Sequence, residues 1–276
     1  DGSVQIKQRR AWTVGHSFEV CSRIFSPLFD QDKPLMPGTI VDIDFQKNHE
    51  DLLLLVNEGD GQLRLLDFAV EAQFNTIDTE ILQEILEATT PKNPLVYPLR
   101  VSNMKSFSKG GNLYDLSIHN IFRENAPLPR KIFVAMVDQR AKEGERERDA
   151  FAYQHFNVSS MALMIGGVPR PIQELDTDLK RQQSLEKACE SVLGKKSNGI
   201  TRENFKTVNH IVGWDLSPTQ TGPLESFTLE RRENVEIKIK LSQPVDHGIS
   251  VLVLSEYEEE LLIDRLGNVT YAASAT

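Results

Sequence analysis

The chain alternates between apolar and polar residues over most of its length, most clearly near its C-terminal end. Between Val235 and Leu241, apolar residues alternate with Glu236, Lys238 and Lys240. This period predicts a strand with one buried and one solvated face. A turn with proline and glycine follows, and the almost wholly apolar run 249–254 predicts a second strand. We expect no catalytic residue type where these two strands meet, so the segment 227–271 is interpreted as structural and not as part of an active site.

The same alternation predicts strands upstream. The predicted strands cover residues 12–25, 39–45, 52–56, 62–74, 95–107, 113–122, 131–137 and 156–165. A Gly-Asp-Gly turn at 59–61 predicts that 52–74 forms a hairpin. Residues 213–218 are interpreted as a loop that enters the last strand pair, and the charged run 141–149 as a solvated loop.

Helical periodicity is confined to two or three short segments. Residues 78–88 place Ile81, Leu82, Ile85 and Leu86 on one face, and Asp78 is a candidate N-cap. A second helix is predicted over 176–193, and a third over 201–209 with Thr201 as its cap. These helices fall in connections and do not alternate with the strands, which disfavours a parallel α/β sheet. The pattern predicts an antiparallel β-sandwich or barrel in a single domain.

Composition narrows the classes of partner. The 276 residues have 39% hydrophobic and 26% charged content, typical of a globular protein, and a formal net charge of −9. Basic clusters are short, at 7–10, 195–196 and 231–232, which disfavours binding to nucleic acid. No apolar run has the length of a membrane span, and no signal-peptide pattern opens the sequence. Cys21 and Cys189 are interpreted as buried free thiols of a reducing compartment.

The sequence contains no recognisable catalytic or metal-binding motif. The histidines do not form metal-ligand spacings; they are His16, His49, His119, His155, His210 and His247. The glycine pairs at 110–111 and 166–167 are interpreted as turns, because no phosphate-binding or nucleophile-elbow motif surrounds them. We therefore predict no catalytic, cofactor-binding or metal-binding residue and no cofactor.

Four weaker candidates each have a structural interpretation that we prefer. Asp42 and Asp44 could be paired carboxylates, but the wet face of an amphipathic strand is favoured. The acidic run 258–260 could bind a cation, but a solvated turn is favoured. Trp214 beside Asp215 could be a ligand platform, but a buried anchor is favoured. The glycosylation patterns at 157–159 and 268–270 are interpreted as chance matches.

Several segments, taken in order, resemble one protein family. The matching segments are RRAWTVGHSFEV (9–20), LFDQDKPLMPGTIVDIDF (28–45), YPLRV (97–101), LPRKIFVAMVD (128–138), FAYQHFNV (151–158), NGITRENF (198–205), WDLSP (214–218) and the EY…IDR…NV ending (256–269). Together they span roughly residues 9 to 270. The chain resembles the major capsid proteins of Polinton/Maverick transposons and the related adintoviruses.

The resemblance implies a structural role without catalysis. Proteins of that family have a double jelly-roll fold, and the matching part here is the second jelly roll, so 1–276 is expected to be one jelly-roll domain with 1–10 as a lead-in. The family implies homotrimeric tiles of an icosahedral virion shell, assembled inside the host cell, with minor capsid or penton proteins as partners. The usual strand order would place the last two strands in opposite sheets, with 249–254 more buried than 235–241.

Two other functions remain open from the sequence. A carbohydrate- or protein-binding β-sandwich is one alternative, although 7% aromatic content with two tryptophans is low for a sugar platform. A cupin-like enzyme is the other, and it would need a pair of closely spaced histidines that the sequence lacks.

Overall fold

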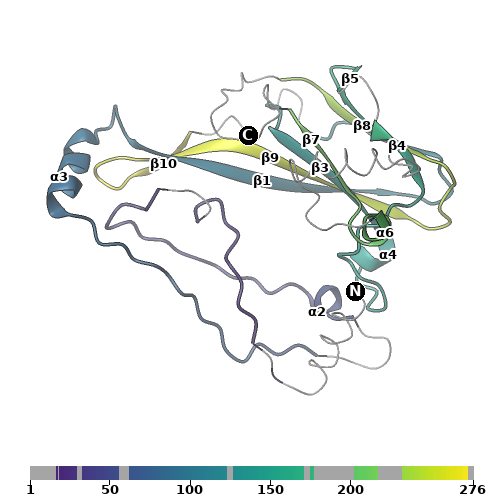
Figure 1. The fold of residues 1–276 in the computed structure, drawn as a ribbon, viewed down its shortest axis with the longest axis horizontal. Helices are drawn as coiled ribbons and strands as arrows, with labels where there is room; N and C mark the ends of the chain where they lie inside the picture. The colour runs from purple at the N-terminus through teal and green to yellow at the C-terminus, as the bar shows by residue number, and fades with distance from the viewer. Residues whose placement is uncertain are drawn as a thin grey trace. The chain divides into compact units, whose positions relative to one another are not determined.

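The computed structural model describes residues 17, 19–29, 33–55, 62–122, 127–170, 175–176, 202–216 and 232–272 (Figure 1). Residues 1–32 and 33–276 form two compact units, and every described strand lies in the second. The strands are β1 (Leu95–Lys109), β2 (Asp115–Ile118), β3 (Lys131–Asp138), β4 (Val158–Ile165), β5 (Val168–Pro169), β6 (Leu175–Asp176), β7 (Ile211–Asp215), β8 (Val235–Leu241), β9 (Ile249–Ile263) and β10 (Val269–Ala272). The helices are α2 (Glu50–Leu53), α3 (Thr79–Ala88), α4 (Gln139–Lys142) and α6 (Arg202–Thr207).

The strands form two antiparallel sheets with jelly-roll order. One sheet has the order β1-β9-β3-β7, with β10 also pairing β9 (Figure 1). The other has the order β2-β8-β4-β5, with β6 also pairing β4. The early strands β1 and β2 pair with the late strands β9 and β8, and successive strands β1 to β4 alternate between the sheets. This connectivity is that of a double-sheet jelly roll, so the predicted fold class is confirmed.

The hydrophobic core lies between the two sheets. On β8, Val235, Ile237, Ile239 and Leu241 are buried while the residues between them are half-buried or exposed. They belong to the same buried cluster as side chains of β2, β3, β4, β7 and β9 from both sheets. The amphipathic period of β8 thus arises because one sheet covers one of its faces and solvent the other.

The two C-terminal strands behave as expected. β8 and β9 lie in opposite sheets. No residue of 249–254 is exposed, whereas Lys238 and Lys240 of β8 are exposed. Both predictions made for this pair of strands are therefore confirmed.

The acidic run 258–260 and the segment at 213–215 were predicted wrongly. β9 continues through the acidic run to Ile263, where a solvated turn was predicted. Its pairing with β1 extends over the whole strand, from Lys109↔Ile249 to Leu95↔Ile263, so the backbone ladder outweighs the low β propensity of glutamate. Residues 213–215, part of the segment 213–218 predicted as loop, belong to β7, which pairs with β3.

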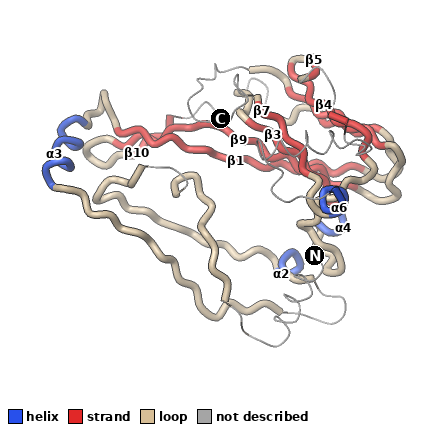
Figure 2. Tube along the Cα trace, in the orientation of Figure 1, coloured by secondary structure: helices blue, strands red, loops and turns tan. Residues whose placement is uncertain are grey.

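The strands predicted before residue 75 are absent from the described residues. Those of 17–74 form loop apart from α2, which replaces part of the strand predicted over 52–56 (Figure 2). A strand needs a neighbouring backbone to complete its hydrogen bonds, and none of the described segments supplies one here. The predicted turn at 59–61 lies outside the described residues.

Two of the three helix predictions are confirmed, those that correspond to α3 and α6. α3 begins at Thr79, and the Asp78 side chain caps it by accepting from the Glu80 amide (3.1 Å). α6 lies inside the predicted 201–209 segment, whose expected cap Thr201 falls outside the described residues. Of the helix predicted over 176–193, only Asp176 is among the described residues, and it belongs to β6, so the predicted start of that helix was wrong. The charged segment predicted as loop contains the end of α4. A single domain over 1–276 stays a prediction.

Among the described residues, no helix is both long and apolar enough to cross a lipid bilayer.

Candidate functional site

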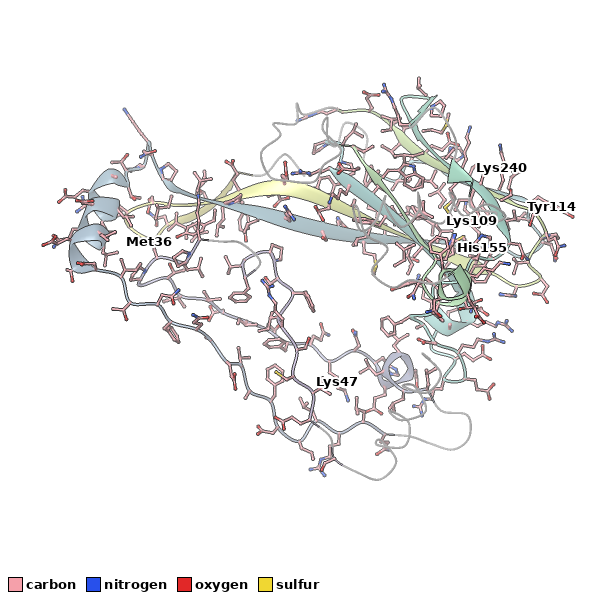
Figure 3. All side chains as sticks on the ribbon, in the orientation of Figure 1. Met36, Lys47, Lys109, Tyr114, His155 and Lys240 are labelled. Carbon is pink, nitrogen blue, oxygen red and sulfur yellow. The ribbon has the colours of Figure 1, made fainter. Side chains whose placement is uncertain are left out.

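Polar and titratable side chains gather at one end of the sandwich. At this end β3 and β8 finish, β4 and β9 begin, and the short helices α4 and α6 lie close by (Figure 1). Figure 3 labels His155 and Lys109 here. The strand order brings together residues that are distant in sequence.

Asp138, the last residue of β3, is the centre of an ion-pair cluster. Its carboxylate accepts hydrogen bonds from Arg140 Nε (3.3 Å) and Nη2 (3.1 Å) and from Arg148 Nη1 (3.1 Å), and His247 Nε2 lies 3.5 Å away. Burial raises the pKa of this carboxyl, but the hydrogen bonds from Arg140 and the nearby His247 more than offset it, leaving the pKa below its ordinary value. Asp138 also caps α4 by accepting from the Arg140 amide (3.0 Å). These hydrogen bonds anchor the end of β3 to α4 and to Arg148.

The β8–β9 turn is fixed against the connection between β1 and β2. The Asn112 amide donates to the Val245 carbonyl (2.6 Å). A Cβ on Gly111 would lie 2.9 Å from the carbonyl carbon of Asp246, so this approach requires glycine. His247 contacts Asp246 through Nδ1 (2.6 Å). The sequence-based expectation of no catalytic residue type at this junction passed over Asp246 and His247.

A cavity of about 670 Å³ lies between this turn, α6 and the segment before β4. Polar groups from three elements line it, among them Gln154, Asn157, Lys206, Thr207 and Asp246. The Thr207 hydroxyl donates to the Glu203 carbonyl (2.9 Å), so it is engaged within its own helix. The arrangement can accommodate solvent or a short polar chain, and it contains no nucleophile paired with a base.

Two imidazoles pack together at the cavity, and one of them, His155, lines it. The His155 and His210 rings are 4.7 Å apart in an edge-to-face arrangement, and Phe205 contacts His210 at 4.9 Å. His210 is 0% exposed, and neither of its ring nitrogens has a hydrogen-bond partner. Burial, helped by His155, lowers the pKa of His210 to about 3, so the ring is neutral at physiological pH. Sequence inspection missed this pair because the two histidines come from separate elements.

The structure gives the weaker sequence candidates different outcomes. Asp42 and Asp44 are exposed and belong to no strand. The predicted strand was therefore wrong, and with it the interpretation of these residues as the wet face of a strand. Glu258 lies in β9 and forms an ion pair with Arg130. Trp214 is 5% exposed and belongs to the core cluster, which confirms the buried-anchor interpretation.

The cysteines and the glycosylation patterns were also predicted from the sequence. Cys21 is free and exposed, so the prediction of a buried thiol was wrong for it. Cys189 falls outside the described residues. Asn157 and Asn268 are exposed, in the connections before β4 and before β10.

No group of three or more metal-ligating side chains is arranged to hold an ion among the residues that the structure describes.

Comparison with known proteins gives no match to a protein-family model or to a curated protein. Solved structures of viral capsids are similar. The mavirus major capsid protein is 10% identical with a TM-score of 0.39, over 74% of this chain and 45% of that one. A structure of the Sputnik virophage is 10% identical (TM-score 0.37; 66% and 39%). PBCV-1 VP54 fitted into a Sputnik reconstruction is 8% identical (TM-score 0.42; 72% and 55%).

The chain therefore covers between 39% and 55% of the length of these solved structures. Similarity at this level does not assign it to a family. A function is therefore inferred from the strand order of the sandwich.

Proposed function

We propose that the chain is a structural capsid protein, or a domain of one, that associates with copies of itself to form a shell tile. The observation that carries this proposal is the jelly-roll strand order, with β1 and β2 paired to β9 and β8. Jelly rolls are common in viral capsid proteins, and they also occur in lectins and cupins. Fold alone therefore does not decide between these functions.

The filled interior favours a structural role over a cupin-like one. A ligand or metal held between the sheets would need space and polar ligands there. The inner positions instead carry apolar side chains packed in one cluster, including Ile132, Val134, Leu163, Ile237 and Val251. The ordered sequence resemblance over roughly residues 9 to 270 favours the capsid over the carbohydrate- or protein-binding alternative.

The finer parts of the proposal come from that resemblance. The chain would correspond to the second jelly roll of a double jelly-roll protein and would act without catalysis. Copies would form homotrimers, contact minor capsid or penton proteins, and be found in a virion assembled inside the host cell.

Sedimentation velocity and mass photometry over a range of concentrations test the proposal. We expect the purified chain to form trimers or larger species whose fraction rises with concentration. A chain that stays monomeric at every concentration would overturn the proposal. Specific binding of such a monomer to a glycan array would instead favour the carbohydrate-binding alternative.

A further inference from the structure

An extended segment before α2 exposes several large apolar side chains. Residues 39–45 alternate strictly in sequence, with Val41, Ile43 and Phe45 on one side. All three are exposed, and Ile40 is 86% exposed. Single exposed apolar residues are ordinary, but four within six positions are a feature of an interaction site. We call residues 39–45 the arm strand.

Contacts on both sides of the arm strand connect its flanking residues to the region of β1. Before it, Lys33 Nζ donates to the Val96 carbonyl (3.0 Å) and Tyr97 Oη to the Pro34 carbonyl (3.3 Å), both at the start of β1. After it, Asp51 pairs with Arg146 (2.5 Å), in the turn that follows α4. α4 in turn contacts β1 near its end, through a hydrogen bond from Lys142 to Ser106. The arm strand thus lies between tethers to opposite ends of β1.

β1 is an edge strand with an unpaired side. It is 15 residues long, and among the described strands it pairs only with β9. Other edge strands, such as β2 and β7, have 4 and 5 residues. A free edge presents unpaired amide and carbonyl groups and can accept another strand. β1 is the edge long enough for the arm strand.

Charge and side-chain placement suit this pairing. β1 carries Arg100, Lys105 and Lys109 and no acidic residue, whereas the arm strand carries Asp42 and Asp44 and no basic residue. The ammonium groups of Lys105 and Lys109 are held by the carbonyls of Ile121 (2.7 Å) and Ser117 (2.8 Å). Lysine often protects an edge from pairing, but the ammonium groups of these two are engaged by a carbonyl of β2 and by one of the connection after it.

We propose that the arm strand of one copy adds to the free edge of β1 in a second copy. Within one chain, the tethers connect both flanks of the arm strand to the ends of β1, yet no ladder forms between the arm strand and β1. Addition to a second copy would complete the backbone hydrogen bonds of both segments and cover the apolar side chains. Passed from copy to copy in one direction, such a contact can close into a ring. The inference rests on the self-association proposed above and names the surface that mediates it.

Photo-crosslinking between isotopically distinct copies tests the proposal. Ile43 is replaced by p-benzoylphenylalanine, and equal amounts of ¹⁴N- and ¹⁵N-labelled chain are mixed as monomers before association. We expect crosslinks from position 43 to peptides of 95–109, about half of them joining a light chain to a heavy one. The matched control carries the crosslinker at Phe74, which is 91% exposed and lies outside the arm strand. It should not label 95–109.

The outcomes separate this inference from the proposed function. If the chain associates but position 43 labels other peptides, or labels 95–109 only within one isotope, the strand addition is overturned and the capsid role stands. If the unmodified chain never associates, the proposed function fails and the inference fails with it. Sedimentation of the unmodified chain distinguishes the two cases.

A charge reversal gives a second test. Asp42→Lys combined with Asp44→Lys should weaken association about tenfold, because both arm charges then oppose the basic edge. Adding Arg100→Glu should restore part of the loss. Association of the double-lysine variant as tight as that of the parent would overturn the proposal.

Discussion

At the scale of single residues, the buried ring of His210 makes the fold sensitive to acid. Its pKa is about 3 in the folded chain and 6.5 when unperturbed, because burial disfavours the charged ring. Between these values the unfolded chain binds a proton that the folded chain does not, so the free energy of unfolding falls as pH falls. One site can contribute about 1.4 kcal/mol per pH unit inside that window and nothing above it.

We expect His210→Phe to reduce this loss of stability, since phenylalanine keeps an aromatic ring against Phe205 and His155 and does not titrate. Urea unfolding at pH 7, 5.5 and 4 measures the effect. Phe205→Leu is the matched control, because it alters the packing against the His210 ring without removing a titratable group and should keep the pH dependence. Equal acid sensitivity in the parent and in His210→Phe would contradict the assignment.

At the scale of elements, the contact between two connections depends on one glycine. Gly111→Ala would place a methyl group 2.9 Å from the backbone of Asp246 in the β8–β9 turn. The two connections would have to separate, and we expect a destabilisation of about 1–3 kcal/mol, the usual effect of overpacking. Thermal or urea unfolding measures it.

Gly110→Ala is the control for that variant. A Cβ there meets nothing within 4 Å, so the same change one residue earlier should have little effect. If the two variants lose equal stability, the cause is the backbone freedom of glycine and not the contact with Asp246.

The element scale also shows what sequence periodicity can predict. Alternation reports which faces of a segment are suited to burial, and it located β1, β3, β4 and β8 well. It does not report whether a partner backbone exists, and so residues 39–45 were wrongly predicted to be paired within the chain. β7 is short and contains Gly213, which left too few alternations to detect.

The chemistry at the end of the sandwich was beyond prediction from periodicity. Asp138, His210 and His247 come from β3, the α6–β7 junction and the β8–β9 turn, which only the jelly-roll order brings to one end. Their spacing in the sequence carries no motif. Asp78 is the opposite case, since a helix cap depends on neighbours two residues away and was predicted directly.

At the scale of the whole molecule, association through the arm strand would couple stability to concentration. A contact made only by folded chains stabilises them by mass action, so the thermal midpoint should rise with protein concentration. Ile43→Pro removes a backbone donor from the arm strand and should make the midpoint independent of concentration. Differential scanning calorimetry over a tenfold or larger dilution series measures this. Phe74→Pro, outside the arm strand, should behave like the parent.

β9 is the central strand of its sheet, and its position in the sequence affects how the protein can be made. It joins β1 on one side to β3 and β10 on the other, yet the ribosome synthesises it long after β1 and β3. While the chain from Asp138 to Ile249 is being translated, both early strands lack β9 as a partner. Their exposed edges must stay soluble for that interval, because unpaired strand edges and exposed apolar surface are prone to aggregation before the chain is complete.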